Sequence, residues 1–503
     1  MYRVYRMVAD NKNINSSIHR ALVFLGGGSL GAYEAGAYKD INEELSRYLK
    51  AEGRGNEPIF HIVSGTSIGA INAAILVSYV KENKTWEGSG DILVEFWEYL
   101  STQSWVDSIP HFTNYWDSWR RLDRRIASGE SARRYFSTKE FIMRGVPNVF
   151  VPKTPLIDNR FFDLSNTWYI YDNKPLKESL EKFAKFPIST SFESGEPRLL
   201  LVAADVQEGT PVIFDSYEKE DGTRKSEYGR YGRVKPDSST NVSEDKEGFE
   251  HVIRYEDGIK SDFVLASCSV PVNYDYTRLN VETRTMIMEE QDDNTNVGDK
   301  NNALSSDARN EVRFFWDGGL LANTPLRQTI LAHRYYWQRV RKVEGDLPRL
   351  RFGIINLHPL KQEYLPSDYD GVVDRKNDII YHDRTEFDEN VAVLMSDFAT
   401  LAQRLLKLAE ESGASKEAVQ MILNETTKVT KSFITRKQGR YEDLLKGKID
   451  VDFVARLERK NDSHTISNKI FDFIRDTILQ LIQDGYEETK DQLKKVFETK
   501  ELK

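Results

Sequence analysis

A serine on a glycine-flanked turn is the first residue of this sequence whose surroundings suit covalent chemistry. The turn reads G-x-S-x-G and comprises Gly65, Thr66, Ser67, Ile68 and Gly69. The apolar run before it predicts a strand, and INAAILVSYVKE after it predicts a helix. A nucleophile on a tight strand-to-helix turn adopts strained backbone angles and needs small neighbours. This context predicts Ser67 as a nucleophile; the alternative is a glycine-rich turn with an incidental serine.

A second glycine-rich turn lies upstream, between the predicted strand 21–25 and a segment of helical periodicity. It reads GGGSLG, and its glycines are Gly26, Gly27, Gly28 and Gly31. Consecutive glycines leave backbone N–H groups uncovered, as an oxyanion hole for acyl transfer requires. The spacing also satisfies G-x-G-x-x-G, the dinucleotide fingerprint, which predicts an acidic residue at the end of the next strand. That strand ends IVSG, so the oxyanion interpretation is favoured.

A carboxylate followed by two glycines occurs about 250 residues after the serine turn. Asp317-Gly318-Gly319 follows the apolar run RFFW and precedes LLANTP. A serine hydroxyl is a poor nucleophile until a base takes its proton, and a partly desolvated aspartate can do so directly. Alone, Asp-Gly-Gly is an ordinary turn signal. In the company of the other two motifs, it predicts Asp317 as the base.

Together the three motifs give this chain a resemblance to the patatin-like phospholipases, which are related to the catalytic domain of cytosolic phospholipase A2. That family combines a glycine-rich oxyanion loop, a G-x-S-x-G turn and a distant D-G-G or D-G-A, in the order found here. ADVQEGTPVIF at 204–214 and ASCSVPV at 266–272 also match, and the sequence after Asp317 resembles D-G-G-x-x-x-N-x-P. The resemblance covers about residues 20–360.

The resemblance implies a site and a fold. It implies Ser67 as nucleophile, Asp317 as base and the amides around Gly27 and Gly28 as the oxyanion hole. It also implies an α/β fold of three layers, α/β/α, with a mainly parallel central sheet and neither a metal nor an organic cofactor. One position departs from the family pattern, because Leu30 stands where a basic residue is usual. Oxyanion stabilisation would then rest on backbone dipoles.

The length and the hydropathy pattern predict one large domain with additions, because 503 residues exceed one ordinary core. We expect an N-terminal extension at 1–19, an acyl hydrolase domain at 20–385 and an α-helical C-terminal region at 386–503. Polar insertions are expected at about 217–250 and 285–310. The apolar residues of the C-terminal region recur at helical spacing, which favours a cover for the sheet or a dimer contact. Membrane docking is a weaker alternative, because the polar faces are not notably basic.

Aromatic side chains concentrate in residues 96–120, where four tryptophans occur. They are Trp97, Trp105, Trp116 and Trp119. A helical cap that packs on the core is the favoured interpretation. The alternative is an apolar lip around an acyl pocket or an interfacial surface.

Charge and cysteine content limit the partners and the compartment. The net charge of −9 without a long basic block argues against nucleic acid and against attraction to anionic membranes. The single cysteine, Cys268, permits neither an internal disulfide nor a cysteine-based metal site, which fits a reducing compartment. The N-terminus lacks an apolar signal segment. We expect a cytoplasmic protein, peripheral at most, that meets its lipid substrate through transient contact with a membrane or micelle surface.

Three functions are therefore open. The first is a lipid acyl hydrolase of phospholipase A or lysophospholipase type that uses a Ser67–Asp317 dyad. The second is a Ser-His-Asp carboxylesterase, since Ser67, Asp317 and His358 follow the chain order of α/β-hydrolases. The third is a nucleotide-binding or membrane-associated scaffold without catalysis. The sequence specifies neither the ester cleaved nor the oligomeric state.

Overall fold

The computed structural model describes residues 18–498, apart from 124–125, 154–167, 229–246, 288–303, 344–346, 363–364, 367, 431–437, 446–450 and 461–465. The predicted N-terminal extension, 1–19, lies outside the described residues except for Ile18 and His19. These two residues begin the first strand of the central sheet.

A ten-stranded sheet forms the middle of the molecule, in the order β14-β11-β1-β2-β5-β10-β9-β8, with β6 and β7 attached beside β5. Its parallel strands are β1 (Ile18–Phe24), β2 (Ile62–Thr66), β5 (Arg198–Asp205), β11 (Arg349–Asn356) and β14 (Val451–Glu458). Every residue of β1, β2, β5 and β11 is buried. Parallel strands covered on both faces need nearly continuous apolar runs, and such runs are what predicted these strands.

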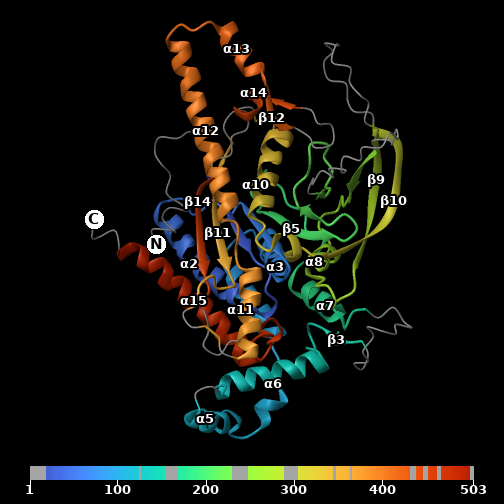
Figure 1. The fold of residues 1–503 in the computed structure, drawn as a ribbon, viewed down its shortest axis with the longest axis vertical. Coiled ribbons are helices and arrows are strands. Elements are labelled where there is room, and N and C mark those ends of the chain that lie inside the picture. Colours follow the sequence, from blue (N-terminus) through green and yellow to red (C-terminus); the bar gives the residue numbers. More distant parts are fainter. Residues whose placement is uncertain are drawn as a thin grey trace.

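The strands beyond β5 run antiparallel. They are β6 (Thr210–Asp215), β7 (Glu227–Tyr228), β8 (Glu247–Val252), β9 (Thr277–Ile287) and β10 (Leu304–Asp317). In Figure 1, β9 and β10 form a long ribbon at one side of the molecule. The insertions expected at about 217–250 and 285–310 therefore contain strand ends, while the middle of each lies outside the described residues. The strand ends within these insertions are polar, and pairing with neighbouring strands satisfies their backbone groups. Hydropathy alone therefore did not reveal them.

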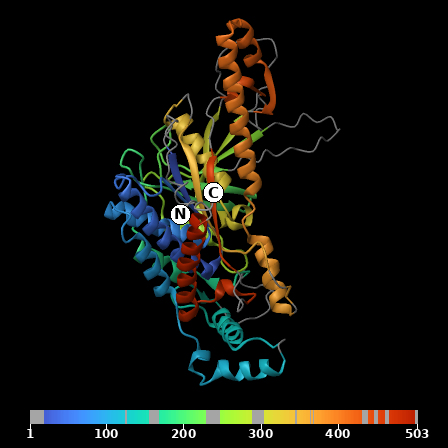
Figure 2. The same cartoon turned by 90° about the vertical axis from the view of Figure 1, so that its left-hand side faces the viewer.

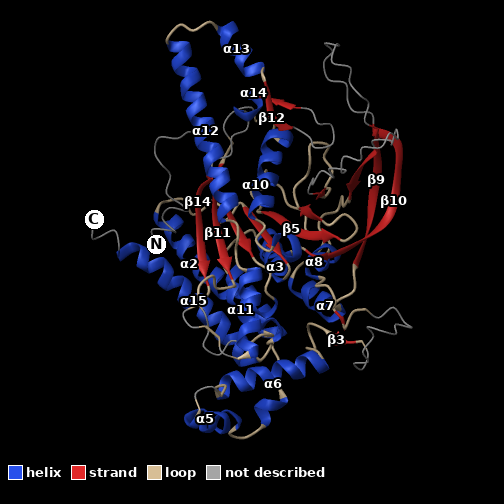
Figure 3. Ribbon diagram, in the orientation of Figure 1, coloured by secondary structure: helices blue, strands red, loops and turns tan. Residues whose placement is uncertain are grey.

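Helices cover the sheet on both sides and give the three-layer α/β/α fold (Figure 3). In one of the two helical layers, α3 and α8 pack most closely against the strands of the sheet. This layer comprises α2 (Gly31–Ala51), α3 (Ile68–Asn83), α4 (Ser89–Leu100), α8 (Ser261–Cys268) and α15 (Arg475–Glu498). The other layer includes α10 (Leu326–Tyr335), which accepts a 3.1 Å hydrogen bond from Arg198 of β5 at the Ala332 carbonyl. The expected three-layer α/β fold is confirmed.

The C-terminal region combines helices with a strand of the central sheet. Helix α11 (Tyr369–Tyr381) precedes this region, whose further elements are α12 (Glu386–Glu411), α13 (Lys416–Asn424), β12 (Thr426–Thr430), β13 (Gln438–Arg440), α14 (Tyr441–Leu445) and the 3-10 turn η4 (Lys469–Phe471). Helix α12 projects from the body of the molecule (Figures 1 and 2). Strand β14 pairs with β11, and α15 packs along α2. The region thus completes both the sheet and one helical layer.

The aromatic segment divides between core and surface. Trp97 of α4 is fully buried, whereas Trp105 and Trp119 are 47% and 48% exposed. The exposed rings belong to η2 (Trp105–Ser108) and α5 (Phe112–Leu122), which lie beside α6 (Gly129–Arg144) at one end of the molecule. The first half of the segment packs on the core, while the second half presents apolar rings to solvent.

The remaining short elements are η1 (Gly28–Leu30), β3 (Val151–Pro152), β4 (Tyr171–Asp172), α7 (Lys174–Phe183), α9 (Gly319–Ala322) and the π-helical turn η3 (Tyr336–Val340). Within the described ranges, none of the helices has both the length and the apolar character that crossing a bilayer requires. The same ranges contain no group of three or more His, Cys, Asp or Glu side chains arranged to hold a metal ion.

Candidate active site

Ser67 occupies the turn between β2 and α3, as the sequence predicted. Its backbone has φ 56° and ψ −129°, a conformation that side-chain-bearing residues rarely adopt. The flanking glycines make this turn sterically feasible, because a Cβ on Gly65 would lie 2.2 Å from the Gly69 carbonyl oxygen. A Cβ on Gly69 would lie 2.7 Å from the Leu25 carbonyl oxygen. This strained turn places the half-buried Ser67 at the N-terminus of α3.

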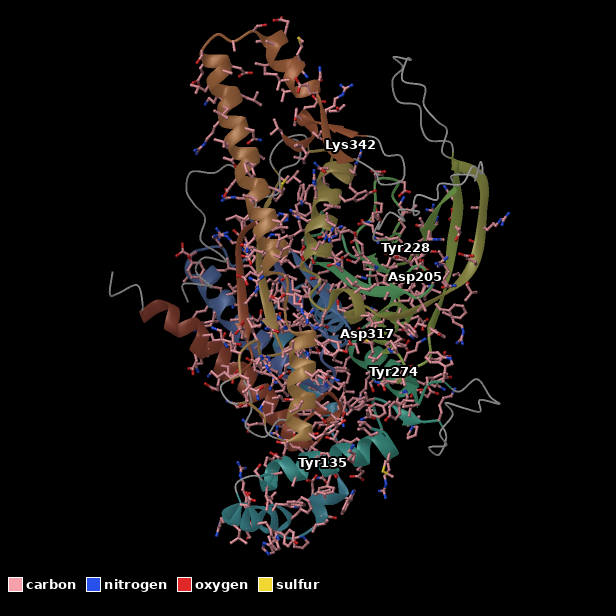
Figure 4. All side chains as sticks on the ribbon, in the orientation of Figure 1. Tyr135, Asp205, Tyr228, Tyr274, Asp317 and Lys342 are labelled. Atoms are coloured by element: carbon pink, nitrogen blue, oxygen red, sulfur yellow. The ribbon has the colours of Figure 1, made fainter. Side chains whose placement is uncertain are left out.

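Asp317 is the last residue of β10 and lies near the centre of the molecule (Figure 4). Its Oδ1 accepts a hydrogen bond from the Gly319 N–H at 2.7 Å. Burial raises the pKa of Asp317 to about 6, although the nearby Ser67 hydroxyl and the Gly319 amide favour the carboxylate and so limit the rise. Within the described residues, Oδ2 accepts no regular hydrogen bond. The carboxylate therefore lies beside the Ser67 hydroxyl with one oxygen available to take a proton.

The glycine loop also lies beside Ser67. A Cβ on Gly26 would be 2.9 Å from Ser67 Cβ and 3.6 Å from its Oγ. In the part of the chain that the structure describes, the amides of Gly26, Gly27 and Gly28 donate no hydrogen bond. Gly31, by contrast, packs against Trp97. The structure thus places Gly26, the first of the four predicted loop glycines, beside the serine, while Gly31 serves the packing of α2.

The segment ASCSVPV holds both candidate reacting groups from α8 and the residue after it. Ser67 N–H donates to Ser267 Oγ at 3.0 Å, and Asp317 N–H donates to the Ser269 carbonyl at 2.9 Å. The Cys268 thiol donates to the Ser67 carbonyl. Burial raises the pKa of Cys268 well above its usual value, so it remains a protonated thiol. Sequence reasoning matched this segment to the family but did not predict that it joins the serine to the aspartate.

The buried carboxyl group of Glu34, which was not among the predicted site residues, supports the glycine loop through hydrogen bonds. Glu34 Oε1 accepts from the Leu25 N–H at 2.6 Å, and Oε2 accepts from Asn72 at 2.9 Å. Asn72 also donates to the Gly31 carbonyl and accepts from Trp97 Nε1. Burial raises the pKa of Glu34 well above its usual value. A glutamate three residues after the last loop glycine, among small and apolar residues of the predicted helix, was the only available signal.

Leu30 and His358 complete the surroundings of the loop. Leu30 is 2% exposed and belongs to the hydrophobic core. His358 follows β11; its Nε2 lies 3.3 Å from the Gly26 carbonyl oxygen, and its Nδ1 lies 3.3 Å from Asp378 Oδ1. Neither ring nitrogen contacts Ser67 or Asp317 among the described hydrogen bonds. The geometry therefore does not favour a Ser-His-Asp triad.

The three-layer fold, with a strained strand-to-helix turn beside a glycine-rich loop, places the chain in the α/β hydrolase class of proteins. The chain belongs to the patatin-like phospholipase family, because the family model described as "Patatin-like phospholipase" matches residues 22–330. The resemblance inferred from the motifs is thus confirmed, and membership supports lipid acyl hydrolysis as the general activity.

Two other comparisons bear on relatives of the chain. Among solved structures, VipD from Legionella pneumophila aligns over 97% of this chain and 72% of its own, with 11% identity and a TM-score of 0.29. No curated protein matches the chain.

Proposed function

We propose that this protein is a phospholipase A or lysophospholipase-type enzyme that cleaves acyl esters with a Ser67–Asp317 dyad. The observation that carries the proposal is the meeting of a strained serine with a buried aspartate from a segment about 250 residues away. The free amides of the Gly26–Gly28 loop beside Ser67 support an oxyanion hole. The elbow residues Gly65, Thr66, Ile68 and Gly69 hold the serine in place.

The arrangement suits a two-step acyl transfer. Ser67 Oγ attacks the ester carbonyl while its proton passes to Asp317, and the loop amides receive the negative charge on the carbonyl oxygen. The C–O bond to the alcohol then breaks, and Asp317 returns the proton to the leaving alcohol. Water attacks the acyl-serine in the same way and releases the fatty acid.

The base must be ionised to accept the serine proton. Burial raises the pKa of Asp317 to about 6, so the carboxylate predominates above that pH and the carboxylic acid below it. We expect kcat/KM for ester hydrolysis to fall as the pH falls through about 6. The corresponding measurement is kcat/KM between about pH 5 and 9, whose acidic limb should show a single ionisation.

The decisive experiment compares purified wild type with Ser67→Ala. Wild type should release fatty acid from phospholipid or lysophospholipid micelles and react with a fluorophosphonate probe, and the variant should do neither while remaining folded. Profiling of the released lipids then identifies the ester position. Hydrolysis retained by Ser67→Ala contradicts the proposal, and a wild type inert to both lipid and probe supports the scaffold alternative.

We include in the proposal a transient contact with a membrane or micelle surface and a cytoplasmic, at most peripheral, location. The exposed rings of α5 and the exposed apolar side chains of α12 support such a contact. The net charge of −9 argues that the contact is apolar rather than electrostatic. Neither a nucleic acid partner, a metal nor an organic cofactor enters the proposal.

A further inference from the structure

A short C-terminal segment packs directly on the glycine loop. Turn η4 lies outside the residues that match the family. Its Ile470 carbonyl oxygen would be 2.5 Å from a Cβ on Gly28, which has φ +58°. The buried Ser29 hydroxyl donates a 2.6 Å hydrogen bond to the Lys469 carbonyl, across 440 positions of sequence. The loop therefore has its outer wall in the C-terminal region.

The side chain of Lys469 reaches the same loop by a second route. Its ammonium lies 2.6 Å from Asp378 Oδ1 and 2.9 Å from Asp374 Oδ1, both on α11, and the lysine side chain is only 7% exposed. Asp378 Oδ1 also contacts Nδ1 of His358, whose Nε2 faces the Gly26 carbonyl. A buried chain of polar contacts thus joins the ammonium to the first glycine of the loop.

The Gly26 carbonyl has a further contact that ends on α11. Asn323 Nδ2 lies 3.4 Å from the Gly26 carbonyl oxygen and donates to the Tyr381 carbonyl at 2.7 Å. A trans peptide is planar, and its C=O and N–H point in opposite directions. Fixing the Gly26 carbonyl therefore also fixes the direction of the Gly27 N–H. Contacts at Gly28 and Ser29 fix the other end of the same short segment.

We propose that Lys469 is a positioning residue for the oxyanion loop: its main chain holds Gly28 and Ser29, and its ammonium holds Gly26 through Asp378 and His358. This inference rests on the proposed function, and it assigns a catalytic contribution to a part of the chain outside the family match. Loss of the ammonium leaves Asp374 and Asp378 buried beside each other without the cation that contacts both, which is unfavourable. Asp378 then loses the contact that orients its carboxylate toward His358, and the direction of the loop amides is less firmly held.

The chain offers a matched control for this idea. Lys219 is also a buried lysine between two carboxylates, with its ammonium 2.7 Å from Asp215 and paired with Glu227. Its side chain is 1% exposed, and its partners lie on β6 and β7. Lys469→Met and Lys219→Met therefore remove the same kind of buried ion pair, but only the first touches the loop.

The test measures kcat, KM and the rate of fluorophosphonate labelling for both variants, with thermal unfolding as a check on folding. Both variants should lose stability. Lys469→Met should also lose about 10- to 100-fold in kcat with little change in KM, and it should label more slowly. Lys219→Met should keep wild-type kcat and labelling. Equal kcat values in the two variants would overturn the positioning role.

A milder variant keeps the test decisive where Lys469→Met does not fold. Ser29→Ala removes only the hydroxyl that donates to the Lys469 carbonyl. We expect a several-fold fall in kcat at nearly unchanged KM, and a wild-type kcat contradicts the inference. The two proposals fail separately, because absence of turnover by wild type contradicts the function, whereas turnover that both loop-side variants retain contradicts only the role of Lys469.

Discussion

Two regions of this chain contribute to the site in different ways. The region that matches the family, residues 22–330, carries the serine, the aspartate and the glycine loop. The region from β11 onward carries none of these groups, but it supplies the His358 contact to Gly26 and the η4 contact to Gly28. The proposed reacting groups thus come from one region, and part of the contacts that align them come from the other. We infer that the portion matching the family carries the proposed reacting groups, while the rest of the chain helps to fix the position of the glycine loop.

The largest effect should come from a reacting group itself. Asp317→Asn keeps the shape of the side chain but removes the base that takes the serine proton. We expect kcat to fall by roughly 10²- to 10⁴-fold, with the protein still folded. Steady-state hydrolysis of a soluble ester gives the measurement. A loss no greater than that of Lys469→Met would erase the distinction between reacting and aligning groups.

The next effect probes the junction between the two regions. Gly28→Ala places a methyl group in a left-handed backbone position and 2.5 Å from the Ile470 carbonyl oxygen. Gly195 is the matched control, because it has φ +68° but nothing within 4 Å of its Cβ position. Gly195→Ala should lose about 1–2 kcal/mol through backbone strain alone. Gly28→Ala should lose about 1–3 kcal/mol more, because the methyl group overpacks the contact with η4.

Urea unfolding and kcat measure the two glycine variants side by side. Only Gly28→Ala should lower kcat, since only that loop faces Ser67. Equal losses of unfolding free energy would show that the loop and η4 do not press on each other.

The candidate site was more predictable than the frame around it. Ser67 and the glycine loop each follow a buried apolar strand and open a helix, so short segments carried their own structural context. Asp317 needed the order of three motifs. The contact between Ser29 and Lys469 spans 440 positions and has no local pattern, because no feature of the sequence beside Lys469 points to a partner so far away.

Strand β14 shows a similar limit on the fold. Its sequence, VDFVARLE, does not alternate strictly between apolar and polar residues, and it lies in a region whose other apolar residues recur at helical spacing. Pairing with β11 buries Val451, Ala455 and Leu457, and only this long-range contact makes the segment part of the central sheet. Sequence periodicity predicted the helices of this region but not its contribution to the sheet.

A smaller effect concerns stability and its dependence on pH. Burial raises the pKa of Asp317 from 3.8 to about 6, so the folded state holds this proton more tightly than the unfolded state. The associated stability is present below pH 3.8 and is lost as the pH rises through about 6, a difference of about 3 kcal/mol at most. Asp317→Asn has no carboxyl group to ionise, so its stability does not fall in this way. The variant should be more stable than wild type at about pH 8 and similarly stable near about pH 4.

Urea unfolding of wild type and Asp317→Asn at the two pH values checks this sign. The result would separate the two regions further, because removal of a reacting group then stabilises the fold while removal of the aligning Lys469 destabilises it. A variant less stable than wild type at pH 8 would mean that the aspartate contributes more to the fold than its burial costs.

The smallest change in unfolding free energy is expected for a substitution on α12. This prediction compares two helices of the C-terminal region, α12 and α15. Leu405 of α12 is 57% exposed, whereas Leu481 of α15 is 6% exposed and lies beside Leu30 of the glycine loop. Leu405→Ala should change the unfolding free energy by no more than about 0.5 kcal/mol. Leu481→Ala should lose about 2–5 kcal/mol, because it leaves a cavity between α15 and the loop. Equal, large losses would mean that α12 is covered in solution; the expected contrast means that folding does not require Leu405 of α12, whereas it does require the packing of Leu481.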